Sequence, residues 1–139
     1  MAGDPSDMIA PVIGSIVVGS DGSETAAEAV RQTIELARAI GARVYLVRAY
    51  EPVPESRLGA EHDLEQWADR MEAAGVEVET LAREGDAADA ILDVAEQRDA
   101  DLVVVGNKGM TGAKRFLLGS VPNKISHHAP CSVLIIRTS

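Results

Sequence analysis

Residues 101–120 read DLVVVGNKGMTGAKRFLLGS, an apolar run followed by a polar, glycine-containing segment that ends in Gly-Ser. The run at 101–106 is the most strongly apolar of its kind in the chain, and its β-branched residues predict a buried strand. The closing Gly-Ser opens a predicted helix over about 120–128. A strand, a loop and a helix in this order predict one unit of an α/β fold.

The same order of strand and helix recurs before this segment, and one more strand follows it. Apolar runs bounded by turn residues predict strands at 14–20, 43–50, 76–82, 101–106 and 132–137. Apolar residues at helical spacing and capping residues predict helices between Ser23 and Gly41, over about 60–74, after Asp86 and over about 120–128. Pro52 and Pro54 predict a loop over 51–59.

Strands that alternate with helices of this length predict right-handed crossovers and a parallel sheet. We therefore expect a doubly wound α/β fold, in which five parallel strands carry helices on both faces. A chain of 139 residues fits one domain. We place this domain at 12–139 and expect a flexible N-terminal tail over 1–11.

Charge and composition argue against several classes of partner. The formal net charge is −9, which opposes binding to nucleic acid and to anionic membranes. No apolar run approaches the roughly 20 residues that span a bilayer. The single cysteine, Cys131, excludes an intrachain disulfide and cannot by itself form a structural zinc site, so a cytoplasmic location fits best.

Three glycines of the segment at 101–120 have the spacing of an anion-binding loop. Gly106, Gly109 and Gly119 fall in the pattern Gly-X2-Gly-X9-Gly-Ser. Glycines allow close backbone approach and positive φ, while Ser120 offers a hydroxyl at a helix N-terminus, so the pattern favours phosphate. The pattern differs from a Walker A loop. The alternative is that these glycines only turn the chain and cap a helix.

The loop resembles the ATP-binding signature of the universal stress protein family. The opening IVVGSDGS is similar to the first strand and turn of that family, and GDAADAILDVAEQRDADLVVVG is similar to its third helix and fourth strand. The stretch LLGSVPNKISHHAPCSVLII resembles its C-terminal end. The resemblance implies a fold of the flavodoxin or Rossmann type, like that of adenine nucleotide alpha hydrolases, with strand order 3-2-1-4-5.

The resemblance also implies the residues that hold an adenine nucleotide. It places Asp21 at the ribose or at a phosphate bridged by Mg²⁺, and the backbone of Ala49 at the adenine. The complete set of implied contacts is Ser20, Asp21, Gly22, Ala49, Val105, Gly106, Lys108, Gly109, Gly119, Ser120 and Val121. Without the resemblance, Asp21 is better explained as an Asp-Gly turn whose side chain bonds local backbone. Pro122 replaces a more usual hydroxyl residue and removes one phosphate donor.

We therefore expect an ATP-binding regulatory protein that forms a homodimer. The apolar last strand would lie at a sheet edge, where pairing with a second copy covers its backbone groups. One alternative is a slow ATPase or a phosphoryl or adenylyl transferase, although no general base is evident beside the glycines. A second alternative is a cyclic AMP binder, because a cyclic monophosphate needs fewer phosphate contacts.

Other chemistry-bearing residues have plainer explanations. His127 and His128 suit the C-terminal end of a helix, and no metal-ligand spacing surrounds them. Cys131 is predicted to be a small core residue, and Trp67 to lie in the core or on a partner surface. Lys114 and Arg115 are either solvated or attracted to phosphate.

Overall fold

Five parallel strands form one sheet in the order β3-β2-β1-β4-β5, which confirms the predicted fold class and strand order. The computed structural model describes residues 12–107 and 119–137. The strands are β1 (Ser15–Gly19), β2 (Arg43–Tyr50), β3 (Val78–Glu84), β4 (Leu102–Gly106) and β5 (Ser132–Ile136). The predicted tail at 1–11 lies outside the described residues, so the proposed domain limits stay a prediction.

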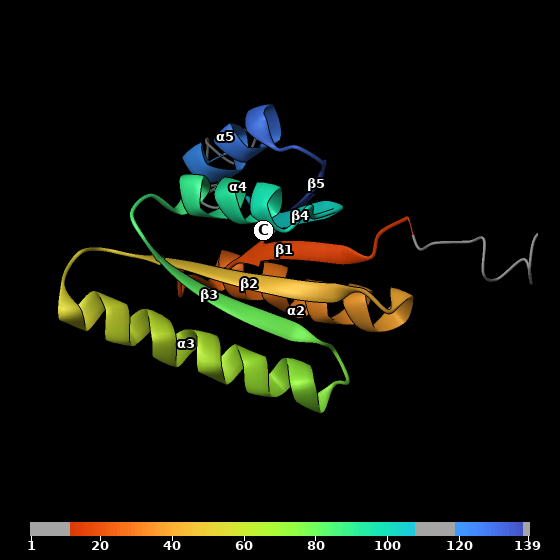
Figure 1. The fold of residues 1–139 in the computed structure, drawn as a ribbon, viewed down its shortest axis with the longest axis horizontal. Helices are drawn as coiled ribbons and strands as arrows, with labels where there is room; N and C mark the ends of the chain where they lie inside the picture. The colour runs from red at the N-terminus through yellow and green to blue at the C-terminus, as the bar shows by residue number, and fades with distance from the viewer. Residues whose placement is uncertain (1–11, 108–118, 138–139) are drawn as a thin grey trace, which may run out of the picture.

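Helices cover both faces of the sheet (Figure 1). They are α2 (Glu24–Ile40), α3 (Pro54–Ala73), α4 (Ala87–Gln97) and α5 (Ser120–His128). Apolar residues of α2 and α3 pack with one face of the sheet, and those of α4 and α5 pack with the other. The fold therefore has two cores, separated by the sheet.

Strand β1 lies at the centre of the sheet, and this position explains why its three middle residues are all apolar. Val17 pairs with Tyr45 of β2 on one side and with Val103 of β4 on the other. Ile16 and Val18 face the core under α2 and α3, while Val17 faces the core under α4. A strand buried on both faces favours a continuous run of Val and Ile over an alternating pattern.

The predicted loop over 51–59 is wrong in its second half, because α3 begins at Pro54. Proline is tolerated at the first helical position, where its missing N–H has no acceptor in the helix and its fixed φ already suits the helix. Gly59 lies inside α3, and a Cβ at this position would contact nothing within 4 Å. The two prolines therefore mark where the helix starts and do not exclude it.

The predicted caps of α2 and α4 are confirmed. Ser23 Oγ accepts a hydrogen bond from the Ala26 N–H at 3.2 Å, and Asp86 Oδ2 accepts one from the Asp89 N–H at 3.0 Å. Each cap satisfies one of the N–H groups that the first helical turn leaves without an intrahelical acceptor.

Asp86→Ala should lower the free energy of unfolding by about 1 kcal/mol, the usual cost of losing an N-cap side chain. Thermal unfolding followed by circular dichroism measures the loss. Asp93→Ala is the matched control, because Asp93 is exposed on the same helix and caps nothing. Equal melting temperatures for the two variants would contradict a capping role for Asp86.

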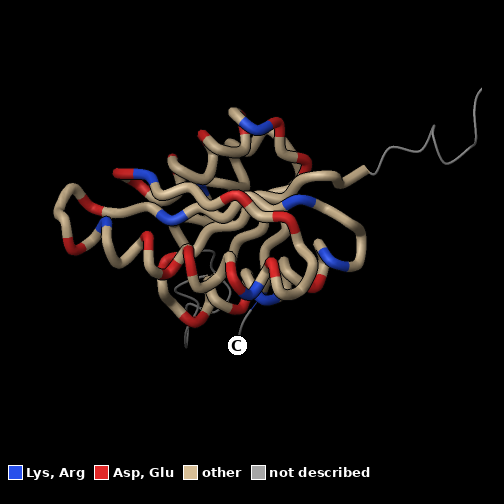
Figure 2. The backbone as a smooth tube through the Cα atoms, turned by 60° about the horizontal axis from the view of Figure 1, so that its bottom comes forward, with Lys and Arg blue, Asp and Glu red and all other residues tan. Residues whose placement is uncertain are grey.

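Charged side chains are spread over the described elements and do not gather in one basic region (Figure 2). The chain holds 22 acidic and 13 basic residues. Many of the basic residues pair with a nearby carboxylate, as Arg98 does with Glu79 at 2.7 Å. In the described residues, none of the helices is long and apolar enough to cross a membrane.

Candidate functional site

A pocket opens at the carboxyl ends of β1, β2 and β4, beside the place where the strand order reverses. This is where ligands bind in open α/β sheets. The described residues that line it are Gly19, Ser20, Asp21, Ala26, Val47, Ala49, Ala87, Ile91, Val105, Gly106, Val121 and Pro122. The space within it, open solvent included, is about 480 Å³.

The walls of the pocket are apolar, and its polar groups lie at its rim. Val47 and Ala49 belong to β2, while Ile91 comes from α4 on the same side of the sheet. A Cβ on Gly19 would lie 2.5 Å from Ile91 Cδ1, so glycine at the end of β1 leaves room for this side chain. Such a pocket suits a flat apolar group with a polar or charged end.

The turn after β1 carries the carboxylate of the pocket. Asp21 Oδ1 accepts a hydrogen bond from the Ser23 N–H at 2.9 Å, and Gly22 has φ +81°. The side chain of Asp21 therefore does bond local backbone, as the simpler interpretation expects. It also lines the pocket, so the turn holds Asp21 at the position that the ligand hypothesis requires.

Gly106 ends β4 against the first turn of α2. A Cβ at this position would lie 2.6 Å from Thr25 Cγ2 and 2.8 Å from the Thr25 carbonyl oxygen. Because the backbone of α2 cannot move away without shifting the helix, the fold itself requires glycine here. Of the two predicted reasons for glycine, close backbone approach and positive φ, the second is wrong for Gly106 and for Gly119, whose φ is −62°.

The N-terminus of α5 faces the pocket through its first turn. Gly119 is the N-cap, Ser120 is exposed, and Val121 and Pro122 line the pocket. The first turn of a helix carries partial positive charge and presents N–H groups to anions. Pro122 has no N–H, so this helix offers one donor fewer than an ordinary helix N-terminus.

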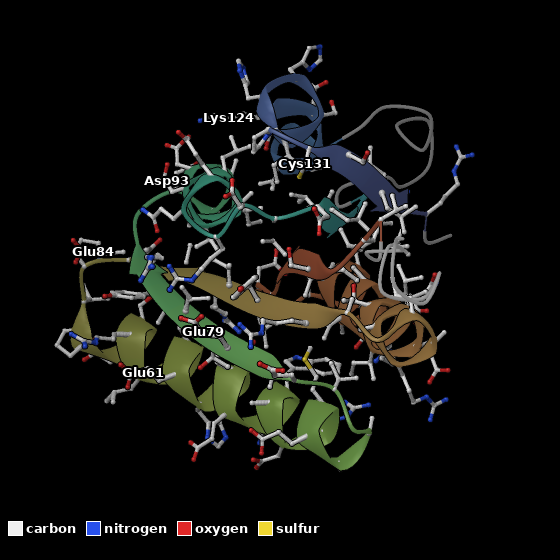
Figure 3. The ribbon with its side chains drawn as sticks, turned by 45° about the vertical axis from the view of Figure 1, so that its right-hand side comes forward. Glu61, Glu79, Glu84, Asp93, Lys124 and Cys131 are labelled. Carbon is white, nitrogen blue, oxygen red and sulfur yellow. The ribbon has the colours of Figure 1, made fainter. Side chains whose placement is uncertain are left out.

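Lys124 ties α5 to α4, the two helices that form one wall of the pocket (Figure 3). Its Nζ lies 2.7 Å from Asp89 Oδ1 and 3.7 Å from Asp86 Oδ2. The hydrogen bond to Asp89 raises the pKa of Lys124 above its ordinary value, so the ammonium stays charged near neutral pH.

Comparison with known proteins gives the family. The model of the universal stress protein family matches residues 13–137. The chain belongs to this family. A universal stress protein of Methanocaldococcus jannaschii is 33% identical over 137 residues, which cover 88% of this chain and 81% of the relative.

Two solved universal stress proteins carry ligands. One, in complex with cAMP, is 34% identical, has a TM-score of 0.78 and is matched over 91% of this chain and 98% of its own. The other, from Archaeoglobus fulgidus in complex with dAMP, is 25% identical, has a TM-score of 0.71 and is matched over 89% and 97%. These matches confirm the resemblance on which the sequence-based predictions rest.

Most residues predicted to contact a nucleotide lie at the pocket of this universal stress protein. Six of them line it, namely Ser20, Asp21, Ala49, Val105, Gly106 and Val121. Gly22 lies in the turn beside it, and Gly119 and Ser120 open α5. Lys108 and Gly109 lie outside the described residues, as do Lys114 and Arg115. The roles of all these residues in binding stay predictions.

Sequence reasoning missed five of the twelve described lining residues, namely Gly19, Ala26, Val47, Ala87 and Ile91, and it discussed Pro122 without counting it among the contacts. Most are apolar residues of ordinary strands and helices, and the apolar pattern that identifies the core is the same for a pocket wall. Gly19 could have been identified from the sequence, because glycine in a buried strand indicates that another group approaches the backbone closely.

The other described residues that the sequence analysis considered do not line the pocket, and their contacts are those of structural residues. Cys131 is half-buried and directly precedes β5 (Figure 3), and burial, followed by the nearby Asp101, raises the pKa of its thiol. His127 is exposed and its Nδ1 lies 2.8 Å from the Asn123 carbonyl oxygen. Trp67 is a buried residue of α3, and the Arg70 guanidinium lies 4.3 Å from its ring centroid. Within the described ranges, no group of three or more His, Cys, Asp or Glu residues could hold a metal ion.

Proposed function

We propose that this universal stress protein binds an adenine nucleotide, with ATP as the leading candidate. The observation that carries the proposal is a single pocket that combines apolar walls with the end of β4 at Gly106 and the N-terminus of α5. Apolar walls suit a purine, and a helix N-terminus suits phosphate. The cAMP and dAMP complexes of related proteins support an adenine ligand.

Each part of the nucleotide has a matching part of the pocket. The adenine fits between Val47 and Ala49 of β2 and Ile91 of α4, where the backbone of Ala49 is the hydrogen-bonding group. Asp21 at the rim fits the ribose hydroxyls or a Mg²⁺ ion that bridges phosphates, since Mg²⁺ in such sites is held by one or two carboxylates and the phosphates. The phosphates point to Ser120 at the start of α5.

The test is to release and identify small molecules from the denatured protein by mass spectrometry, followed by calorimetric titration with ATP and with cAMP. Recovered ATP, or micromolar ATP binding, supports the proposal. A protein that releases no nucleotide and binds neither ligand contradicts it.

A preference for cAMP is the second candidate, and a specific observation favours it. Pro122 removes one N–H donor from the first turn of α5, and a cyclic monophosphate needs fewer donors than a triphosphate. Titration of the same preparation with both nucleotides decides the order of affinities.

We propose a regulatory role over a catalytic one. Efficient phosphoryl transfer needs a positioned nucleophile and charge stabilisation. Among the described lining residues Asp21 is the one carboxylate, and its Oδ1 already accepts the Ser23 N–H. Phosphate release that disappears in Asp21→Ala while nucleotide binding persists would favour a slow ATPase or transferase. The net charge of −9 supports a protein without nucleic-acid or membrane partners, and the single cysteine, Cys131, supports a cytoplasmic location.

We also propose a homodimer through β5, which lies at one edge of the sheet. Leu134 of this strand is 40% exposed, and an exposed apolar edge strand favours pairing with a second copy. Leu134→Lys should convert the dimer to a monomer in analytical ultracentrifugation at micromolar concentration. Leu58→Lys, at an exposed leucine of α3, is the control and should leave the dimer intact. A wild-type protein that sediments only as monomer refutes the proposal.

A further inference from the structure

A polar cluster lies directly behind the turn that carries Asp21, on the opposite face of the sheet from the pocket walls of α4 and α5. Ser20 Oγ donates a hydrogen bond to Asp63 Oδ2 at 2.6 Å, and Arg48 Nη1 lies 2.7 Å from the same oxygen. Ser20 follows β1, Arg48 lies on β2 and Asp63 lies on α3. The cluster therefore joins a helix to two strands whose ends form the pocket.

The cluster is partly shielded from water, so its contacts are stronger than those of a fully exposed ion pair. Ser20 is 6% exposed, and the side chains of Arg48 and Asp63 are each 22% exposed. A half-buried carboxylate that receives both a guanidinium and a hydroxyl recovers much of its desolvation cost, whereas removal of one partner leaves the other charge uncompensated.

Arg48 also lies beside the turn. A Cβ placed on Gly22 would lie 3.4 Å from Arg48 Nη2, so the guanidinium occupies the space next to this glycine. Asp63 holds the guanidinium at this position. Without the Asp63 carboxylate, a half-buried positive charge would remain next to the turn that carries Asp21, and it would attract the Asp21 carboxylate away from the pocket.

Ser20 is shared by two cavities. It lines the pocket at the strand ends, and it also lines a groove on the other face between the turn and α3, with Asp63 and Trp67. None of the described residues that line the first pocket belongs to α3. Figure 1 places α3 on the face of the sheet opposite to α4 and α5.

We propose that Asp63 is a positioning residue of the nucleotide site, which holds Ser20 and Arg48 behind the Asp21-Gly22 turn and so couples α3 to nucleotide binding. The inference rests on the proposed function. Because coupling between two sites is reciprocal, a nucleotide that needs the ordered turn also stabilises the attachment of α3. A role confined to holding α3 on the sheet predicts no such response to nucleotide.

The experiment combines titration with hydrogen exchange on the full chain. In the wild type, saturating ATP or cAMP should slow amide exchange in α3 around Asp63. Asp63→Asn should weaken nucleotide binding about tenfold, which corresponds to the smallest free energy usually lost with a hydrogen bond to a charged group. At saturating nucleotide this variant should also lose the protection of α3.

Three further variants separate positioning from general stability. Asp69→Asn makes the same change at an exposed position of α3 and should bind nucleotide as the wild type does. The double variant Arg48→Gln with Asp63→Asn removes the positive charge that Asp63→Asn leaves uncompensated. It should therefore bind nucleotide more tightly than Asp63→Asn alone, and a double-mutant cycle measures this difference. If Asp63→Asn does not fold, Ser20→Ala removes only the hydroxyl of the cluster and should still reduce the protection of α3.

The outcomes distinguish this inference from the proposed function. If the wild type binds neither nucleotide, both are wrong. If the wild type binds but ATP leaves exchange in α3 unchanged, or if Asp63→Asn binds and protects α3 like the wild type, only the positioning role of Asp63 is wrong.

Discussion

Replacing Val121 by glutamate should abolish nucleotide binding. Val121 lies in the first turn of α5, is half-buried and lines the pocket. Two like charges about 4 Å apart repel by about 4 kcal/mol at an effective dielectric constant of about 20. Even with substantial screening by salt, the dissociation constant for ATP should rise at least about a hundredfold. Calorimetric titration measures the change.

The variant should remain folded, because an acidic residue in the first turn of a helix interacts favourably with the helix dipole. Val121→Thr is the matched control, since threonine has nearly the same shape and no charge, and it should retain nucleotide binding. If Val121→Glu binds ATP as tightly as the wild type, the phosphates do not lie at α5 and the proposed orientation of the nucleotide is wrong.

Gly106→Val should have the largest effect on stability. A Cβ at Gly106 would lie 2.8 Å from the Thr25 carbonyl oxygen, and the branched side chain of valine adds two more methyl groups at the same contact. Overpacking against backbone should cost about 3 kcal/mol in the free energy of unfolding and lower the melting temperature by about 10 °C. Nucleotide binding should fall as well, because β4 and α2 both contribute to the pocket.

Gly59→Ala provides the contrast for this prediction. A Cβ at Gly59 contacts nothing within 4 Å, and alanine inside a helix is favoured over glycine by about 0.5–1 kcal/mol. This variant should therefore be more stable than the wild type in the same thermal unfolding experiment. A Gly106→Val protein that melts like the wild type but does not bind ATP would show that Gly106 is needed only by the ligand.

The two glycines also show what the sequence reveals about the site. The spacing of Gly106 and Gly119 identifies the correct end of the sheet, since both lie where the pocket and α5 begin. The spacing cannot reveal that Gly106 packs against Thr25, because this contact joins residues 81 positions apart. One glycine can thus serve the fold and the ligand together.

Strands β1 and β4 were predicted well because burial on both faces gives them a continuous apolar run. The outer strand β3 lies at Val78–Glu84, two residues later than the predicted 76–82, because most of its residues are not buried and its apolar pattern is weak. The start of α3 was missed because Pro54 disrupts a helix interior but suits a helix start, and local sequence does not distinguish the two positions. The cluster of Ser20, Arg48 and Asp63 was also missed. Its members come from three separate elements, and only the assembled sheet brings them together.

The central position of β1 governs the order in which the chain can assemble during synthesis. One neighbour, β2, begins at residue 43, whereas the other, β4, begins only at residue 102. Until the ribosome releases β4, one edge of β1 has no partner, and the pairing of β4 with β1 then brings together segments that are far apart in the chain. The first three strands can pair earlier, so the part of the polypeptide from residue 102 onward completes both the sheet and the pocket.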